Sequence, residues 1–538
     1  MPKAVPIRNI GAAGVIADIA PYNTPLTSFT RAKNVRFVSG AVERAPIFRE
    51  VKQYTDNPAY AYALSSQTGY DSTLVVTDLF SILELVGETS STVYTGAAAS
   101  ANALPYTATT LANVHYVNRT DKTPVYRTPS MTNFSVLPNF PASTTCRSLR
   151  AYGDFLLALN TAEGAAEYPT RVRWSDLALA NNIPSTWDET DTTKSAGYND
   201  IVQFKTPIID GLSLGSNFYI YSSDQVYLME FVGGQFIFNF RKAIGNRGVI
   251  NTNCVVEVDG KHYVFDKNDI YVHDGISSMS ICDKRTKTYI FDAIDLSKAS
   301  YCYVQHNETL KEVYFCYNSA DDLVKFEGVD FCNRAAVYNY KDDTWSFIDL
   351  PNTVSGTYTS VAAVETYDTV TLTYESVGGS YAAQDSQFTR YPVMLSLASA
   401  VGDNTISENR LIASDFINTG TLAKAYVEEI NGPAYIKRQS FDLDEMQFPI
   451  SGYKSITRIY PQISSPTNDM EAAFAFGASK LTTEIPDLED PVTFAVDSDY
   501  KVDTRISGRY LTYEVTLPQP KDFTFSGFDF DVSVVGRR

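Results

Sequence analysis

A five-residue stretch with the spacing of a hydrolase nucleophile is the first place where this sequence could do chemistry. Residues 211–215 read G-L-S-L-G, which fits the G-x-S-x-G elbow that exposes a nucleophilic serine between a strand and a helix. The residues that follow, N-F-Y-I-Y at 217–221, predict an aromatic strand instead of a helix. We therefore expect Ser213 to lie beside a turn and not to be catalytic.

Clustered carboxylates are a second possible source of catalysis. They occur at residues 321–322, 342–343 and 487–490, each time beside turn-forming residues. Asp favours turns because its side chain bonds nearby backbone N–H groups, and we prefer this interpretation to a glycosidase pair. Residues 339–347, N-Y-K-D-D-T-W-S-F, resemble the Asp-box turn of sialidase blades only weakly, because the glycine of that motif is missing and the segment occurs once.

The histidines and cysteines are too scattered to indicate a zinc module. The four histidines are His115, His262, His273 and His306. The six cysteines form no C-x-x-C pair, and we expect them to be reduced and mostly buried as small apolar side chains: Cys146, Cys254, Cys282, Cys302, Cys316 and Cys332. No phosphate-binding G-x-x-x-x-G-K-[ST] loop is present. The sequence therefore predicts no enzymatic activity, no cofactor, and no catalytic, cofactor-binding or metal-binding residue.

Length and composition limit the fold classes and functions that are possible for this chain. The chain has 538 residues, which suits about two to four domains. Aromatic residues make up 13%, with 36 Tyr and 30 Phe, which is typical of β-rich proteins. The formal net charge is −18, and an acidic chain is a poor candidate for gripping nucleic acid through its phosphates. The first 25 residues lack a continuous apolar stretch, and no apolar run approaches a membrane span.

Short strands and polar turns alternate at a regular spacing between residues 55 and 352. The turns at Ser222 and Asp266 lie 44 positions apart, and Tyr263 and Tyr314 lie 51 apart. A period of about 40–50 residues with about four strands per unit is typical of β-propeller blades. We predict an all-β protein with a propeller of about six blades over residues 55–352; a β-sandwich with irregular hairpins is the alternative.

Two further regions flank the predicted propeller. Residues 1–54 contain N-V-R-F-V-S-G-A-V-E-R-A-P at 34–46, which predicts a hairpin with a Gly turn, packed on the propeller or on the C-terminal domain. Residues 353–538 predict a second, sandwich-like β domain that could serve as a platform for docking. In its last strand, phenylalanines lie on both sides of Gly527, which indicates a bulge or a bend.

Several segments together resemble the tail nozzle, or packaged-DNA stabilisation (tail tubular B-type), proteins of short-tailed bacteriophages. They are the hairpin at 34–46, R-V-R-W-S-D at 171–176 followed by W-D at 187–188, the stretch 245–275 and the C-terminal strands from 508 to 538. The resemblance does not extend to residues 380–435, and no single motif is unique to the family. Its weight lies in the order and co-occurrence of these segments.

The resemblance implies a structural virion protein in the phage tail, assembled in the host cytoplasm. Such a protein forms a homohexameric ring below the portal and adaptor, contacts tail fibres or spikes, and closes the channel until the genome is ejected. Duplex DNA would pass without specific binding, and the acidic composition fits this expectation. The alternative is a receptor-binding or glycan-binding propeller associated with a tail fibre, for which three unevenly spaced Trp offer little support.

Overall fold

The all-β prediction is confirmed by the computed structural model, in which strands dominate and helices are few. The structure describes residues 3–65, 71–86, 89–96, 105–234, 236–354, 358–360, 390–400, 405–415, 428–444, 452–466 and 470–536. The helical segments within them are short: η1 (Pro21–Asn23), α1 (Lys287–Ala293), η2 (Leu296–Tyr301) and η3 (Glu428–Ile430). Among these residues, no helix is long and apolar enough to cross a membrane.

Six groups of four consecutive antiparallel strands follow one another along the chain, and we call them the first to sixth sheets; the first five are separate sheets, whereas the sixth is part of an eight-stranded sheet. The first three comprise β8 (Pro58–Ser65), β9 (Asp71–Thr77), β10 (Ile82–Val86) and β11 (Thr89–Tyr94); β12 (Tyr106–Leu111), β13 (Val114–Arg119), β14 (Val125–Arg127) and β15 (Ser135–Val136); and β16 (Thr144–Tyr152), β17 (Phe155–Glu163), β18 (Ala166–Trp174) and β19 (Gly197–Asp200). The next three comprise β20 (Ile208–Leu214), β21 (Asn217–Ser222), β22 (Gln225–Phe231) and β23 (Phe238–Gly245); β24 (Val255–Val258), β25 (Lys261–Phe265), β26 (Ile270–His273) and β27 (Ser278–Ser280); and β28 (Tyr303–Asn307), β29 (Glu312–Tyr317), β30 (Cys332–Asn339) and β31 (Thr344–Val354).

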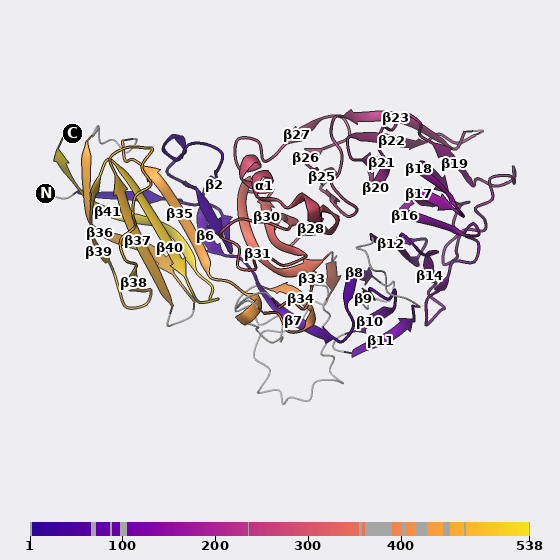
Figure 1. The fold of residues 1–538 in the computed structure, drawn as a ribbon, viewed down its shortest axis with the longest axis horizontal. Coiled ribbons are helices and arrows are strands. Elements are labelled where there is room, and N and C mark those ends of the chain that lie inside the picture. Colours follow the sequence, from indigo (N-terminus) through magenta and orange to yellow (C-terminus); the bar gives the residue numbers. More distant parts are fainter. Residues whose placement is uncertain are drawn as a thin grey trace.

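These sheets are arranged in a propeller-like ring (Figure 1). The first strand of each sheet contacts the first strand of the next, from β8 through β12, β16, β20 and β24 to β28. Tight turns join many of the consecutive strands within these sheets, and the turn at Gly153 has the positive φ of 56° that glycine adopts without strain. The predicted hairpin turns therefore recur as the repeating feature of the ring.

The eight-stranded sheet continues beyond β31 into a further group of strands, here called the closing sheet, which lies between the sixth sheet and the first and adds one group to the expected count of about six. The end of β31 pairs with β33 (Arg390–Ser396), as does β32 (Tyr358–Ser360), and the sheet continues through β34 (Asn409–Asp415) to β7 (Ile47–Tyr54). Met394 and Ile412 pack against the sixth sheet, whereas Leu395 and Leu411 pack against the first. Strands from both ends of the chain thus close the ring.

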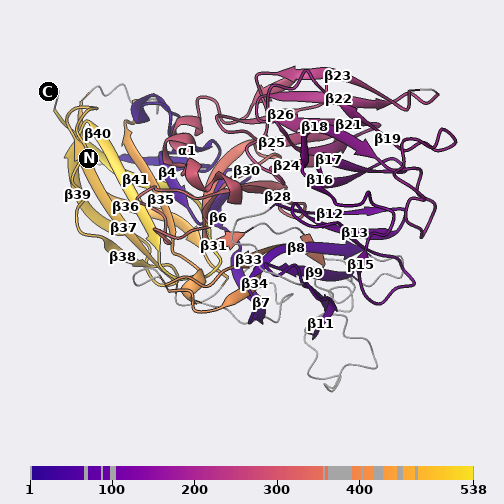
Figure 2. The same ribbon diagram turned by 45° about the vertical axis from the view of Figure 1, so that its right-hand side comes forward.

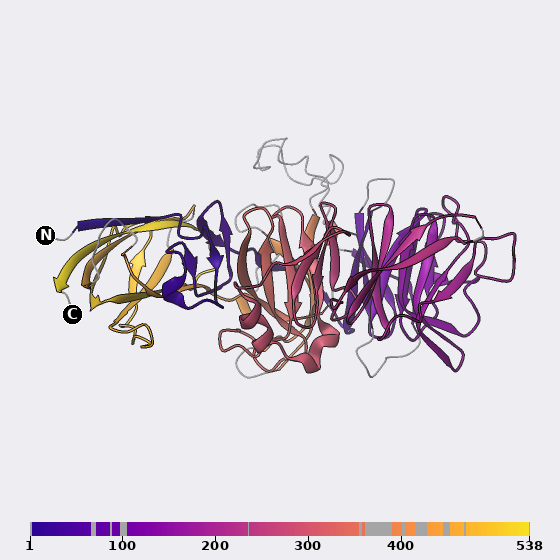
Figure 3. The same ribbon diagram turned by 90° about the horizontal axis from the view of Figure 1, so that it is seen from above.

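The remaining strands form two sheets that pack face to face beside the ring (Figures 2 and 3). One has the order β39 (Val502–Gly508), β36 (Tyr453–Ser464), β41 (Thr524–Gly536), β6 (Ala41–Arg44) and β5 (Val35–Val38), with β1 (Lys3–Arg8) also paired to β41. The other has the order β38 (Val492–Ala495), β37 (Glu471–Ser479), β40 (Tyr510–Leu517), β35 (Ala434–Phe441) and β4 (Arg31–Lys33). Between β1 and β4, the chain also forms a short parallel pair of strands, β2 (Gly14–Val15) and β3 (Ser28–Phe29).

An aromatic core joins the two sheets of this sandwich. Phe474 on β37 contacts Phe525 and Phe528 on β41, with ring centroids 6.3 Å apart in both pairs. Strict alternation would place Phe525 and Phe528 on opposite faces. The register of β41 shifts between the partners of Gln462 and Ile463, next to Gly527, so both rings point inward and are fully buried. The predicted bulge is therefore present, and it preserves the core.

The sheets divide the chain differently from the predicted boundaries of 1–54, 55–352 and 353–538. Strands β33 and β34, at residues 390–396 and 409–415, belong to the ring, although we expected them in the C-terminal domain. The N-terminal segment contributes β1, β4, β5 and β6 to the sandwich and β7 to the ring. The predicted hairpin is β5–β6, turning at Ser39 and Gly40, both of which have positive φ. Pairing between distant segments, which local patterns do not reveal, accounts for these differences.

Candidate functional site in the sheet ring

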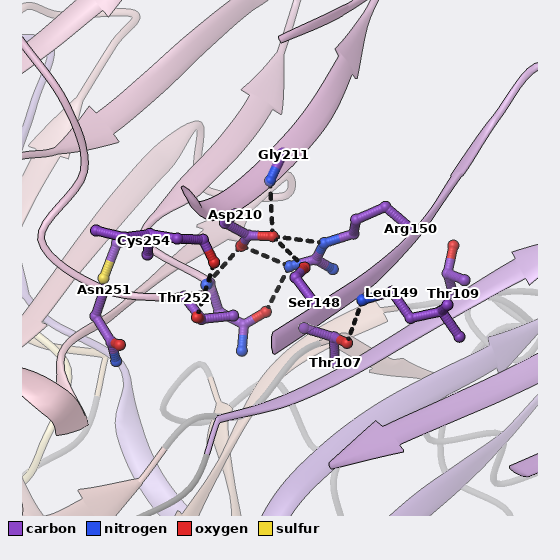
Figure 4. Close-up of polar contacts among 12 residues, drawn as sticks. Thr107, Thr109, Ser148, Leu149, Arg150, Asp210, Gly211, Asn251, Thr252 and Cys254 are labelled. Atoms are coloured by element: carbon purple, nitrogen blue, oxygen red, sulfur yellow. Dashed lines mark hydrogen bonds and ion pairs between the residues drawn. The ribbon is translucent and has the colours of Figure 1, made fainter. Parts of the chain in front are cut away.

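A buried carboxylate near the inner strands of the ring lies at the centre of an extensive polar network (Figure 4). Arg150 binds Asp210 with both branches of its guanidinium group, at 2.9 Å to Oδ1 and 2.7 Å to Oδ2. Oδ1 also accepts hydrogen bonds from the Ser148 hydroxyl at 2.6 Å and from the Gly211 backbone N–H at 2.9 Å. Oδ2 accepts one from the backbone N–H of Asn253 at 2.9 Å.

The network connects four successive sheets. Arg150 lies on β16 of the third sheet and Asp210 on β20 of the fourth, while Asn253 immediately precedes the fifth sheet. The Asn253 side chain accepts a hydrogen bond from Arg150 and donates one to the backbone oxygen of Tyr106 on β12, both at 2.9 Å. Thr107 adds a further link, because its hydroxyl accepts from the backbone N–H of Leu149 at 3.0 Å. The network therefore fixes the inner edges of these sheets relative to one another.

The electrostatics of the pair favour a permanently charged state. Burial alone would raise the pKa of Asp210, but the positive charge of Arg150 and the hydrogen bonds outweigh burial and lower it. For Arg150, burial opposes the charged form, yet Asp210 raises its pKa. Both carboxylate oxygens are engaged by protein donors, so this arrangement suits a structural lock better than proton transfer or ligand binding.

A second buried cluster joins the fourth and fifth sheets through two histidines and a tyrosine. The Tyr221 hydroxyl lies 2.6 Å from Nδ1 of His262 and 2.6 Å from Nε2 of His273. His262 Nε2 lies 2.9 Å from the backbone oxygen of Ser213, and His273 Nδ1 lies 3.2 Å from the backbone N–H of Gly275. One direction of donation satisfies every atom: Gly275 to His273, His273 to Tyr221, Tyr221 to His262, and His262 to Ser213.

This chain of hydrogen bonds requires both histidines to be neutral. Burial lowers the pKa of His262 to about 4, and burial together with the neighbouring His262 lowers the pKa of His273 to about 3. The Tyr221 hydroxyl, which is fully buried, has its pKa raised well above its ordinary value. Among the described residues, no group of three or more His, Cys, Asp or Glu side chains is placed to hold a metal ion.

The serine of the G-x-S-x-G segment has no nucleophile geometry. Ser213 lies near the end of β20, and the chain turns through Gly215, with a φ of 60°, into β21. Its hydroxyl donates to the backbone oxygen of Ala151 at 3.4 Å, a long hydrogen bond. The strand that follows this turn agrees with the sequence prediction and differs from the helix that an elbow requires.

The predicted acidic turns are occupied by structural contacts. Asp321 pairs with the buried Arg334 at 3.1 Å, and Asp322 pairs with Arg31 at 3.0 Å on the surface. Asp343 pairs with Arg285 at 2.7 Å. In the segment 487–490, Glu489 accepts a long hydrogen bond from Thr504 at 3.4 Å. The three segments are thus engaged with different partners, and each carboxylate named here has a structural contact.

The R-V-R-W-S-D segment anchors a long connection of the third sheet. Arg171 binds Asp200 through Nε at 2.7 Å and lies between the rings of Tyr168 and Tyr198, 3.5 and 4.0 Å from their centroids. Asp176 accepts hydrogen bonds from the Ser185 hydroxyl and the Ser195 backbone N–H. The polar residues of this segment therefore hold the connection between β18 and β19 in place.

All six cysteines are free and buried, as the sequence predicted. Burial raises the pKa of each thiol, to about 12 for Cys282 and Cys302. A thiol of this kind is neutral and unreactive at neutral pH. The cysteines accordingly serve as apolar packing groups.

Comparison with known proteins does not assign the chain to a family. No family model matches the sequence, and no significant match is found among curated proteins.

Proposed function

We propose that this chain is the tail nozzle protein of a short-tailed phage, a structural subunit of a ring that closes the DNA channel and conducts the genome during ejection. The observation that carries the proposal is a rigid, propeller-like ring of sheets joined to a separate sandwich. The sequence resemblance described above spans both of these parts. The proposal assigns the chain a mechanical role, for which it needs no catalytic group.

The internal contacts of the ring support this role. The Asp210 network fixes four successive sheets, and strand β7 closes the ring from the N-terminal side. Such a ring can bear load while its exposed connections contact neighbouring subunits. The sandwich, which contains both ends of the described chain, offers a second rigid body for docking to an adaptor.

The charge of the chain supports a conduit for DNA. A hexamer of chains that each carry −18 would present a strongly acidic assembly. Phosphates are repelled by such a surface, so a duplex can pass without being held. Because like charges cannot hold a gate shut, closure before ejection would depend on packing or polar contacts between loops.

The burial of the tryptophans argues against the glycan-binding alternative. Carbohydrate sites on propellers commonly present aromatic faces to solvent, and tryptophan is well suited to this. Trp187 and Trp345 are almost completely buried, and Trp174 is 8% exposed. The indole N–H of Trp345 donates to the backbone oxygen of Ile281, and that of Trp174 donates to Ser195. These rings are therefore committed to the interior.

Deletion of the protein from the virus that encodes it tests the proposal. Particles made without the chain are expected to package DNA and then leak it, and the protein should localise to the distal tail in complete virions. Particles that keep their genome normally would contradict the stopper role. Failure to build heads would place the protein elsewhere in assembly.

Measurements on the purified protein provide a second test. A ring of six would have a mass of about 358 kDa, six times the 59.6 kDa of the chain. Assembly on the adaptor complex is expected to give this stoichiometry by native mass spectrometry. The isolated chain should bind duplex DNA negligibly at physiological salt, since counterion release needs clustered Lys and Arg. Tight, salt-sensitive DNA binding would overturn the conduit mechanism.

A further inference from the structure

An uncharged, solvent-exposed hairpin tip projects from the fourth sheet, between β22 and β23 (Figures 1 and 2). The ten residues 231–240, F-V-G-G-Q-F-I-F-N-F, contain no charged side chain. Phe231, Val232 and Phe236 are 58%, 55% and 75% exposed. Large apolar side chains gathered in this way on a protruding tip are unusual on a protein surface and mark a site of interaction.

The base of the hairpin holds this tip rigidly. Phe231 and Phe238 pair across the two strands, and Phe238 is buried against Phe155 and Trp174, with ring centroids 5.0 and 5.1 Å apart. The hydroxyl of Tyr152 accepts from the backbone N–H of Phe231 at 3.3 Å. The exposed side chains therefore stand on an ordered support, and burying them in a partner would not require the strands to fold first.

Two backbone N–H groups of the tip donate to a carbonyl oxygen on its other side. The N–H groups of Val232 and Gly233 both donate to the backbone oxygen of Ile237, at 3.0 and 3.3 Å. Gly233 and Gly234 have φ values of 69° and 78°, a conformation that glycine adopts without strain and that makes the tight reversal possible. A tip that carries no charged side chain, and in which the N–H groups of Val232 and Gly233 are already bonded, leaves water at a lower cost than a charged loop.

Charged groups begin where the tip ends. Glu230 and Arg241 face each other across the strands at 3.1 Å, and Lys242 follows. The hairpin from residue 225 to 245 therefore has one acidic and two basic side chains, in a chain whose formal charge is −18. This sequence of an apolar tip followed by a polar, slightly basic collar matches the passage from acyl chains to headgroups at a membrane surface.

We propose that the β22–β23 tip inserts into the interfacial region of a lipid bilayer. A protein partner fits less well, because a stable protein interface buries about 800 Å² on each side, whereas a narrow convex tip offers only a few side chains. Insertion into lipid needs no complementary pocket, and Phe is well suited to the interface. This inference concerns the hairpin alone and does not depend on the nozzle assignment.

Sedimentation of the full chain with vesicles tests the proposal. Vesicles of phosphatidylcholine alone and of phosphatidylethanolamine with phosphatidylglycerol at 3:1 are the two probes, each in low and in 0.5 M salt. The parent chain is expected to sediment with both, and Phe236→Asp should reduce the bound fraction about tenfold, since apolar insertion is the driving interaction. Ile485→Asp, at an 80% exposed apolar residue of the sandwich, is the matched control and should bind like the parent.

A tryptophan placed at the tip reports insertion directly. The three native tryptophans are buried, so the vesicle-dependent signal of Phe236→Trp would arise at the tip, and its emission should shift to shorter wavelength on vesicle addition. The proposal is overturned if the parent chain does not bind, if both Asp variants lose binding equally, or if salt abolishes all binding. A concentration-dependent dimer that Phe236→Asp dissolves, without vesicle binding, would identify a second copy as the occupant and equally overturn it.

Discussion

Two parts of the ring hold neighbouring sheets together in different ways. Between the second and fifth sheets, the inner strands are tied by the Arg150–Asp210 pair and its hydrogen bonds. Between the sixth sheet and the first, the closing sheet presents apolar side chains on both faces, with Ile412 toward one neighbour and Leu411 toward the other. The first part adds a buried ion pair to its packing, whereas the second relies mainly on packing and is joined to the sixth sheet by single hydrogen bonds such as that from Gln305 to the backbone oxygen of Val393 at 2.9 Å.

The difference follows from how the chain supplies each part. The polar part is built from sheets whose strands follow one another in sequence. The closing sheet combines residues 47–54 with residues 390–396 and 409–415 and must bring both ends of the ring together. Apolar packing tolerates small adjustments of position, whereas a bidentate ion pair tolerates very few. The ring therefore closes through its more adaptable contact.

Removal of the central carboxylate should have the largest effect on stability. Asp210→Ala leaves the guanidinium of Arg150 buried without its partner, which costs about 3–5 kcal/mol in the free energy of unfolding. Urea denaturation followed by circular dichroism measures this loss. Asp322→Ala is the matched control, because Asp322 is 77% exposed in its ion pair with Arg31 and should change stability by less than about 1 kcal/mol. Equal effects of the two variants would contradict a structural role for the network.

A cavity in the closing sheet should have a comparable or somewhat smaller effect. Leu411 is completely buried on the face toward the first sheet, and Leu411→Ala is expected to cost about 2–5 kcal/mol. Leu179→Ala makes the same chemical change at a position that is 72% exposed and should stay within about 0.5 kcal/mol. If Leu411→Ala were as mild as Leu179→Ala, packing would not be what closes the ring.

Acid should weaken the polar part of the ring more than the closing sheet. His262 and His273 have folded-state pKa values lowered to about 4 and 3, so the unfolded chain binds protons first as the pH falls below about 6.5. Their contribution to stability is complete above pH 6.5 and is lost progressively toward pH 4 and below, at about 1.4 kcal/mol per pH unit for each proton. The charged neighbours Asp274 and Arg247 act on His273 in opposite directions.

The variant His273→Gln separates this effect from general acid sensitivity. Removing one titrating histidine should reduce the number of protons taken up on unfolding between pH 6 and 4.5 by up to one. The slope of the unfolding free energy against pH should therefore fall by up to about 1.4 kcal/mol per pH unit. Thermal or urea unfolding over this range measures the slope. Leu411→Ala, which removes no titrating group, should keep the slope of the parent chain. An unchanged slope in His273→Gln would show that the histidines do not titrate as their burial implies.

The sequence predicted the local features of the fold and missed those that depend on distant segments. Turn residues such as Gly153 and the spacing of the hairpins indicated repeated sheets, and the phenylalanines around Gly527 indicated the bulge. Strand β7, however, pairs with β34 more than 350 residues away, and nothing in its own pattern identifies the partner. The short helix α1 was also missed, because seven residues give little helical periodicity.

The two buried polar clusters also differ in whether the sequence could have predicted them. His262 and His273 were treated as isolated, although both lie in the predicted hairpin around residues 266–269 and are cross-strand partners in its register. Their positions on either side of that turn could have identified them as cross-strand partners. The Arg150–Asp210 network has no such signal, because its members lie on different sheets and each is an ordinary polar residue of a strand.

The smallest effect is expected at the residue that most resembles a catalytic one. Ser213→Ala removes a hydroxyl whose hydrogen bond to Ala151 is long, while the backbone oxygen that accepts from His262 remains. The free energy of unfolding should change by no more than about 0.5 kcal/mol, and under the proposed nozzle function the variant should assemble and support infection like the parent. Gly215→Ala is the control, because Gly215 has a φ of 60° with open space around it, and a Cβ in this conformation costs about 1–2 kcal/mol. The turn should therefore matter more than the serine beside it; loss of infectivity in a stable, assembled Ser213→Ala particle would instead mean that the hydroxyl acts chemically.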